Sequence, residues 1–505
     1  MARCRLIVHS ACVAAFLLMA RPFEAAAYNW LQFNGDPQHS GSNTQETVIT
    51  PDNVKGLRKL FQVTLPAVAD GSPVYLGNVA MPGGQQNLLF LTTREGHLIA
   101  LDARTGARVW TRQVPAGTCR INNGARSCIT TSSPAIDPGL ELIYSYGLDG
   151  RVHKYRVADG GEVTGGGWPQ PATLKPFDEK GSSNLTIATA RNGADYLYVP
   201  HSGYLGDQGD YQGHLTVIDL RTGSQKVFNG LCSDQPVHFA ERPGRPDCPE
   251  VQAGIWARAG VVYDQGTDRI FAVTGNGTFA PRAFDWGDTV LALRPDGSGA
   301  AGGPLDSYTP TDHQLLQIAD KDLGSTAPAI LPVPPGGRIA HLAVQGGKDD
   351  TLRLLDLDNL SGRGGPGQAG GEIGRAIAVP QGGEVLTAPA VWVRPGDRST
   401  WVFIANDRGI SGLRLVNENG LPALETEWKR PHGGTSPLVA NGVLFYAGSG
   451  GIRALDPETG KQLWGERIGS IHWQSPIVAD GVLYVPDEDG TLTAFSIPGA
   501  APLPR

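Results

Sequence analysis

The sequence predicts an all-β fold, an eight-bladed β-propeller with four-stranded blades, and three observations support this. A phrase of the form Gly-x-Leu-x-Ala-Leu-Asp-x-x-Thr-Gly-x-x-x-Trp recurs, most clearly at residues 96–110 and again at 452–464, where Ile452 stands in place of the first Leu of the phrase. Strand-like starts containing Ser-Pro or Ala-Pro recur at intervals of roughly 40–75 residues, as in repeat architectures. The 505 residues include 68 Gly and 38 Pro, which is rich in turns, and no long helical pattern of period 3.6 interrupts them.

The recurring phrase has the features of two strands joined by a tight turn. Leu98 and Ala100 alternate with their neighbours at period two, as half-buried strands do. Asp102 and the following Thr-Gly supply side-chain acceptors for backbone N–H groups and a residue that accepts positive φ. The chain then re-enters the sheet, and Trp110 is expected to fill the space between neighbouring blades.

The count of blade starts gives the expected ring size. Each start is a short Ser- or Ala-containing phrase, where an innermost strand begins and a missing proline N–H costs little. The candidates begin at Ser72, Ser133, Ser182, Ala257, Ala327, Ala388, Ser436 and Ser475. The segment from Val54 to Leu65 precedes the first start, and we expect it to supply the outer strand of the last blade and so close the ring.

The N-terminus has the pattern of an export signal. Arg3 and Arg5 precede an apolar stretch at 11–20, and residues 25–27 are all Ala, which offers a cleavage site before Tyr28. We therefore expect a signal peptide at 1–27, one propeller domain at 28–505, and a periplasmic or secreted protein. The alternative is a buried N-terminal helix. No segment is long enough to span a membrane, and a net charge of −7 argues against nucleic acid as a partner.

The cysteines that remain after the signal are Cys119, Cys128, Cys232 and Cys248. An even number in an oxidising compartment predicts two disulfides. Local pairing, Cys119 with Cys128 and Cys232 with Cys248, is favoured because each pair brackets a polar insertion. Cross-pairing and a metal site are the alternatives, although no C-x-x-C or His spacing accompanies these residues.

These repeats, with their Trp-bearing ends, resemble the pyrroloquinoline quinone (PQQ) type propeller from about Asn29 to the C-terminus. The opening phrases at 29–33 and 53–57 also resemble those of the quinoprotein alcohol dehydrogenases within this superfamily. The superfamily also contains non-enzymatic members, such as an outer-membrane assembly lipoprotein, so the fold alone does not give the function.

Two phrases resemble cofactor-binding phrases of the dehydrogenases. Asn276, in Val-Thr-Gly-Asn-Gly, matches the Asn that binds calcium beside the quinone, and an amide oxygen suits a hard cation. Lys348 lies in a phrase that resembles the one presenting a cation to the quinone carbonyls, where it would stabilise negative charge. The alternatives are an ordinary Asn-Gly turn and a solvated lysine in a hairpin.

Other site residues follow from the resemblance with departures from the family pattern. Gln208 stands at the position of a calcium-binding Glu, with Asp207 beside it as a second candidate metal ligand. Asp320 and Asp322 lie near the place of the catalytic Asp, with a surface acidic loop as the alternative. Trp256 is the candidate for the Trp that stacks on the quinone, although it comes several residues early.

The resemblance implies an oxidoreductase of alcohols or related small molecules that uses PQQ and calcium. The chain lacks the pair of adjacent cysteines that cover the quinone in the dehydrogenases, and it has no C-x-x-C-H haem motif. An enzyme of this kind would need a separate electron acceptor. The alternative is a catalytically inactive propeller that serves as a ligand- or protein-binding scaffold in the cell envelope.

Overall fold

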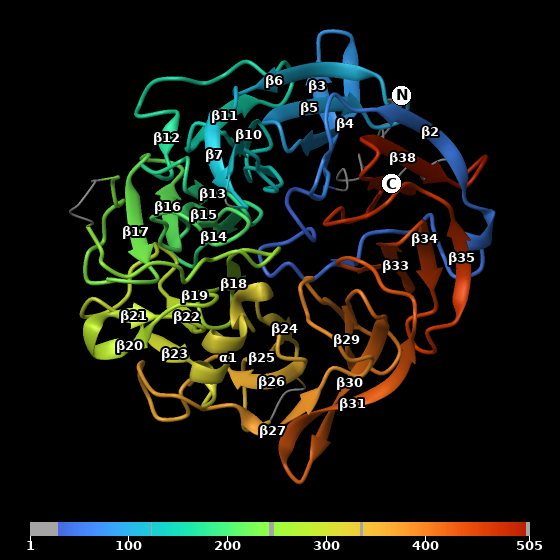
Figure 1. The fold of residues 1–505 in the computed structure, drawn as a ribbon. Helices are drawn as coiled ribbons and strands as arrows, with labels where there is room; N and C mark the ends of the chain where they lie inside the picture. The colour runs from blue at the N-terminus through green and yellow to red at the C-terminus, as the bar shows by residue number, and fades with distance from the viewer. Residues whose placement is uncertain (1–28, 123, 242–246, 334–336, 501–505) are drawn as a thin grey trace, which may run out of the picture.

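The structure, a computed structural model, describes residues 29–500 except 123, 242–246 and 334–336. The expected signal peptide at 1–27 lies outside the described residues. Eight twisted antiparallel sheets stand around a central axis, and the chain passes from one sheet to the next around the ring (Figure 1). The predicted eight-bladed propeller with four-stranded blades is confirmed.

The first half of the ring follows the chain, with the first strand of each blade innermost. Blade one contains β3 (Val74–Met81), β4 (Gly84–Thr92), β5 (His97–Asp102) and β6 (Arg108–Gln113). Blade two contains β9 (Ala135–Ile136), β10 (Leu142–Tyr146), β11 (Arg151–Arg156) and β12 (Gln170–Pro171). Blade three contains β14 (Thr186–Thr189), β15 (Asp195–Gly203), β16 (His214–Asp219) and β17 (Gln225–Asn229). Blade four contains β18 (Val262–Asp264), β19 (Arg269–Val273), β22 (Val290–Leu293) and β23 (Asp306–Tyr308).

The second half repeats this pattern until the last blade. Blade five contains β24 (Ala329–Leu331), β25 (Leu342–Gln345), β26 (Thr351–Asp356) and β27 (Ile373–Ala378). Blade six contains β28 (Ala390–Val393), β29 (Thr400–Ala405), β30 (Ile410–Glu418) and β31 (Leu421–Arg430). Blade seven contains β32 (Leu438–Ala440), β33 (Val443–Gly448), β34 (Gly451–Leu455) and β35 (Gln462–Glu466). Blade eight contains β36 (Ile477–Ala479), β37 (Val482–Pro486) and β38 (Thr491–Ser496) from the C-terminal end.

The outer strand of blade eight comes from the other end of the chain. It is β2 (Arg58–Thr64), which pairs antiparallel with β38 from Arg58 opposite Ser496 to Thr64 opposite Thr491. This strand lies within the segment expected to close the ring, so that prediction is confirmed. Closure gives β38 a partner on its outer side and completes the four strands of the last blade.

The recurring turn contributes to the packing between neighbouring blades, as blades one and two show. Asp102 Oδ1 accepts hydrogen bonds from the backbone N–H and the hydroxyl of Thr105, both at 2.8 Å. The equivalent turn glycine of blade two, Gly160, has φ +64°, and a Cβ on it would lie 2.6 Å from the ring of Trp110 in blade one. Trp110 also donates to the carbonyl of Val157 in blade two at 2.9 Å. The tryptophan thus packs on the turn of the next blade, as expected.

Several short strands and helices lie outside the four-stranded blades. The strands are β1 (Ser42–Asn43), which pairs with β32, the hairpin β7 (Thr118–Ile121) and β8 (Gly124–Ser127), β13 (Glu179–Lys180), and the hairpin β20 (Phe279–Ala280) and β21 (Asp285–Trp286). The helices are α1 (His313–Ala319) and three single 3-10 turns, η1 (Val54–Gly56), η2 (Pro281–Ala283) and η3 (Leu323–Ser325). Disulfides join Cys119 to Cys128 and Cys232 to Cys248, which confirms the local pairing.

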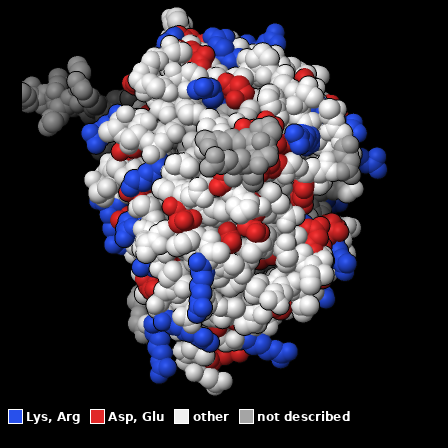
Figure 2. Space-filling model, turned by 60° about the vertical axis from the view of Figure 1, so that its left-hand side comes forward, with Lys and Arg blue, Asp and Glu red and all other residues white. Residues whose placement is uncertain are grey.

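The outer surface carries no large field of one charge on the side that Figure 2 shows, where acidic and basic side chains are scattered among uncharged areas. The one α-helix in the described ranges, α1, has seven residues. No helix in that part of the chain is therefore long and apolar enough to cross a membrane.

Candidate functional site

The topology of the blades gathers particular loops on one face of the ring. In a four-stranded antiparallel sheet, the start of strand one and the ends of strands two and four lie on the same side. The links between blades and the loops between the second and third strands therefore share a face. Trp256 and Asp322 lie in links, before β18 and β24, and Asn276 and Lys348 lie in second-to-third-strand loops, after β19 and β25.

A pocket of about 330 Å³ opens among these loops. Six of the seven candidate site residues line it: Asp207, Trp256, Asn276, Asp320, Asp322 and Lys348. Gln208 does not line the pocket, although it follows Asp207 directly. The other lining residues come from the links that lead into blades two, three, four and eight and from the second-to-third-strand loop of blade three, and they are Thr131, Lys180, Ser182, Ser202, Gly203, Tyr204, Leu205, Gly206, Tyr211, Gly254, Arg258 and Trp473.

Asp322, Asp320, Asn276 and Lys348 form one hydrogen-bonded cluster. The backbone N–H of Asn276 donates to Asp322 Oδ1 at 2.7 Å, and its side-chain Nδ2 donates to Asp320 Oδ1 at 2.8 Å. The Lys348 ammonium contacts Asp322 Oδ2 and lies 3.3 Å from Asp320 Oδ1. Asn276 Oδ1 is buried and accepts no hydrogen bond from any residue that the structure describes. An amide oxygen without a donor is therefore available at this end of the pocket.

The Lys348 ammonium also lies 5.2 Å from the centre of the Trp256 ring. Burial lowers the pKa of Lys348, but the charges of Asp322 and Asp320 outweigh burial and raise it above its ordinary value. Gly275 keeps this arrangement compact, because a Cβ there would lie 3.0 Å from Trp256 Nε1. The cluster thus presents an aromatic ring, a stable cation and an acidic residue to the same space.

Asp207 reaches the cluster from the loop of blade three. Its Oδ1 accepts a hydrogen bond from the Tyr211 hydroxyl at 2.7 Å. Burial raises the pKa of Asp207, the Tyr211 hydrogen bond opposes this, and repulsion by Asp322 and Asp320 adds to the increase. Asp207 therefore lies in the electrostatic field of the two other carboxylates.

A further carboxyl group, Asp288, is buried beneath this cluster and was not found from the sequence. It is 1% exposed, its Oδ1 accepts the backbone N–H of Leu323 at 3.0 Å, and its Oδ2 has no hydrogen-bond partner. Burial raises the pKa of Asp288 to about 8, and repulsion by Asp322 contributes to the shift. The group is therefore mainly protonated at neutral pH.

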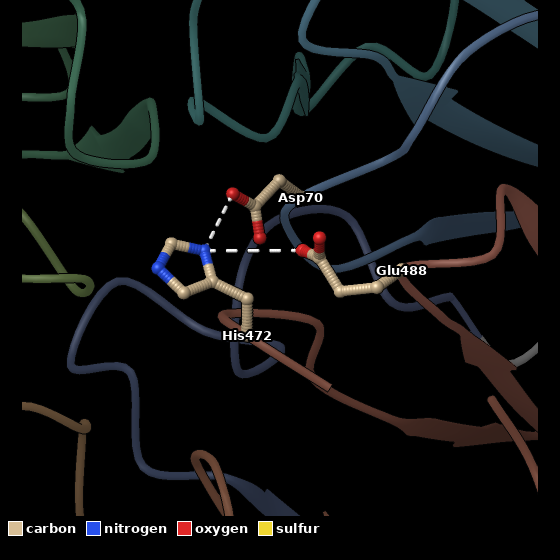
Figure 3. Close-up of side chains that lie close together, drawn as sticks. All are labelled: Asp70, His472 and Glu488. Atoms are coloured by element: carbon tan, nitrogen blue, oxygen red, sulfur yellow. Dashed lines mark hydrogen bonds and ion pairs between the residues drawn. The ribbon is translucent and has the colours of Figure 1, made fainter. Parts of the chain in front are cut away.

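A second polar cluster contains Asp70, His472 and Glu488 (Figure 3), and Arg94 bonds both of its carboxylates. It adjoins the pocket through Trp473, which follows His472 and lines the pocket. Arg94 Nη2 lies 2.6 Å from Asp70 and 2.7 Å from Glu488, and His472 Nδ1 lies 2.9 Å from Asp70 Oδ2. Burial raises the pKa of Asp70, but the hydrogen bond and charge of His472 and the charge of Arg94 lower it well below its usual range. Because Arg94 already bonds both carboxylates, we interpret the cluster as a network of ion pairs.

Two cationic residues of the pocket were also missed by sequence reasoning. Lys180 and Arg258 line it from the links that lead into blades three and four. Arg258 lies in the Ala-Arg-Ala phrase that marked a blade start. A charged residue between two alanines where a strand begins at the channel could have been predicted to face the pocket. Lys180 carries no such signal, because its Lys-Gly-Ser-Ser surroundings are those of an ordinary surface loop.

The cysteines do not form a wall of the pocket. The Cys119–Cys128 disulfide packs with Leu148 and Tyr204, and only Tyr204 of these lines the pocket. The hairpin that carries the disulfide is fixed to the pocket rim, because the Asn122 N–H donates to the Leu205 carbonyl at 2.8 Å. The disulfide therefore supports the rim from behind.

A comparison with protein families matches residues 75–293 and 412–499 to a PQQ-type repeat family described as "Outer membrane protein assembly factor BamB". The match covers more than half of the chain. The chain belongs to this family. The matched ranges include Trp256 and Asn276 but leave out Lys348, so the match defines the repeats and leaves the function of the site open. No curated protein sequence matches the chain.

Solved structures with the same fold include quinoprotein dehydrogenases. A europium-containing methanol dehydrogenase has a TM-score of 0.63 and 16% identity, covering 94% of this chain and 99% of its own. The quinohemoprotein alcohol dehydrogenase from Comamonas testosteroni has a TM-score of 0.63 and 16% identity, covering 95% and 82%. An alcohol dehydrogenase from Pseudomonas putida HK5 has a TM-score of 0.63 and 14% identity, covering 94% and 81%. At this identity the likeness shows a shared fold.

The pocket residues fit the two groups that the resemblance implies. Trp256 offers an aromatic face to a flat quinone, and Lys348 offers a cation beside it. For a hard cation, Asn276 Oδ1 is an oxygen donor without a partner, and Asp322 supplies a carboxylate. The sequence departures remain, since Gln208 lies outside the pocket and no adjacent cysteines face Trp256.

Proposed function

We propose that this protein is an exported oxidoreductase that acts on an alcohol or a related small molecule with PQQ and a bound cation such as calcium. The observation that carries the proposal is the meeting of Trp256, Asn276, Asp322 and Lys348 in one pocket, with Asn276 Oδ1 left without a partner. These residues come from links and loops far apart in the sequence. The likeness in fold to dehydrogenases supports the same proposal.

Each pocket residue has a defined task in this proposal. Trp256 and Lys348 would hold the quinone, and Asn276 and Asp322 would hold the cation. Bound PQQ would supply a two-electron acceptor. Asp322, fixed by the Asn276 N–H and the Lys348 ammonium, would accept the proton of the substrate hydroxyl. Lys348 would remain charged and stabilise negative charge that develops beside it.

The proposal is tested by titrating the purified protein with PQQ and calcium while binding is monitored by calorimetry and absorbance. We expect calcium-dependent binding close to one equivalent, which is lost in Asn276→Ala and Lys348→Ala and kept in Lys461→Ala. Lys461 is an exposed lysine on blade seven and serves as the matched control. A binding-competent protein should then reduce an artificial electron acceptor when alcohols are supplied.

The second candidate function is a binding scaffold of the cell envelope without turnover. It is favoured by the family description and by the departures at Gln208 and at the missing cysteine pair. Absence of PQQ binding at micromolar concentration, with or without calcium, would exclude the oxidoreductase proposal. Envelope proteins and glycans would then be the ligands to search.

A further inference from the structure

Lys180 is a largely buried lysine that lines the pocket. It is 8% exposed and lies on β13. Its neighbour Glu179 turns the other way and pairs with Lys175 at 3.3 Å. Within the described residues, the Lys180 ammonium takes part in no hydrogen bond and no ion pair. Its side chain lines the pocket, so a molecule bound there is the partner that the ammonium could contact.

Arg258, the second buried cation of the pocket, is held by neutral groups. Its guanidinium donates to the backbone carbonyls of Ser182 at 2.9 Å, Thr131 at 2.8 Å and Asp70 at 3.2 Å. It also lies 5.7 Å from the centre of the Trp473 ring. These contacts fix the position of Arg258 across three blades, but none of them supplies a negative charge. Arg258 Nε is buried without a hydrogen-bond partner.

The nearest carboxylates are already engaged. Asp70 accepts hydrogen bonds from Arg94 and from the Trp473 N–H, and Glu488 is bonded to Arg94. Of the cations that line the pocket, Lys348 is paired with Asp320 and Asp322, whereas Lys180 and Arg258 have no carboxylate partner within the described residues. Burial lowers the pKa of Lys180 to about 8, the charge of Asp70 opposes this, and Arg258 and Arg94 add to it. An added anion would balance the charges.

We propose that Lys180 and Arg258 form a carboxylate-binding subsite on the inner wall of the pocket, so that the molecule bound there is an organic acid. The hydroxyls of Thr131, Ser182 and Ser202 line the same pocket, and a charge-assisted hydrogen bond from Lys180 would satisfy its ammonium. This inference deepens the proposed function, on which the choice of ligand rests. The carboxylate belongs to the quinone or to a hydroxy acid substrate.

Binding measurements on wild type, Lys180→Gln and Lys180→Arg separate these sources. In the first arm, calorimetry compares PQQ with its neutral trimethyl ester. In the second arm, it compares glycerate with glycerol at millimolar concentration. Lys461→Gln is the matched lysine control, and Arg258 is left unchanged because it ties three blades together.

For at least one of the two acids, we expect binding to weaken tenfold or more in Lys180→Gln and to persist in Lys180→Arg and Lys461→Gln. Wild type should bind the neutral counterpart of that acid, the trimethyl ester or glycerol, more weakly than the acid. Loss confined to PQQ assigns the subsite to the quinone, and loss confined to glycerate assigns it to the substrate. Glycerate binding that depends on Lys180 without any PQQ binding supports the subsite and contradicts the proposed quinone.

Two results would overturn the subsite. One is equal binding of PQQ by wild type and Lys180→Gln together with no binding of glycerate, which leaves the proposed function intact. The other is binding of the neutral ester or of glycerol as tight as that of the corresponding acid. Thermal unfolding of Lys180→Gln checks that this variant is folded. If Lys180→Gln does not fold, Lys180→Arg still tests the subsite, because it retains the positive charge.

Discussion

Replacing the Asp288 carboxyl group by an amide, in the variant Asp288→Asn, should stabilise the protein near neutral pH. The carboxyl group is 1% exposed, and Asn has nearly the same shape and keeps an oxygen that can accept the Leu323 N–H. The residue has φ +46°, in the left-handed region that Asn tolerates well. The substitution therefore removes an ionisable group with little change in packing.

The expected size follows from the pKa of Asp288, which burial raises from 3.8 to about 8. Between these values the unfolded chain loses its proton while the folded protein keeps it, so the stability of the wild type falls as pH rises. Each pH unit corresponds to about 1.4 kcal/mol. At pH 7 the accumulated loss is on the order of 4 kcal/mol, and the Asp288→Asn variant would avoid it.

Thermal or denaturant unfolding from pH 4 to pH 8 measures this difference. The Asp288→Asn variant and wild type should be similar near pH 4, and the variant should become progressively more stable toward pH 8. Asp52→Asn, at an exposed position, is the control and should follow wild type. A difference in stability that does not change across this range, or a variant less stable at pH 7, would refute the burial argument.

Three further outcomes are expected. Gly160→Ala should destabilise the ring by about 1–3 kcal/mol, because its Cβ would lie 2.6 Å from the Trp110 ring, and a thermal shift measures this. Carboxylate binding at Lys180, whose charged neighbours are Asp70, Arg258 and Arg94, should be full below about pH 8 and weaken above it, as calorimetry across pH would show. Replacing both Cys119 and Cys128 by Ser should cost about 2–4 kcal/mol, measured by unfolding with and without reductant.

The fold was predictable because short sequence phrases mark the strands and turns of each repeat. The Ser-Pro and Ala-Pro starts mark where inner strands begin, and Ser72-Pro73 precedes β3 directly. The Asp-x-x-Thr-Gly turn fixes hairpin geometry by contacts within a few residues. The closing strand was predictable too, because a strand-like segment before the first blade has only the last blade left to pair with.

The site was predictable only where family phrases mark it. Asn276 and Lys348 lie in loops whose phrases resemble the dehydrogenases, and the topology then brings both to one pocket. Lys180 and Asp288 could not be found in this way, because their importance comes from burial and from partners distant in sequence. A lysine or an aspartate in a loop has no local feature that tells whether water or protein surrounds it.

The closing strand also sets an order of events in folding. Gln62 in β2 and its contact Thr491 in β38 are 429 positions apart, so the pairing cannot begin until nearly the whole chain has been made. Contacts at such separation form slowly, because the entropy of closing a long loop must be lost first. Strand β2 is therefore the first of the blade strands to be synthesised, and its partner β38 is the last. Until they pair, β2 and the outer side of β38 lack their partners, and an unpaired strand edge can pair with other chains.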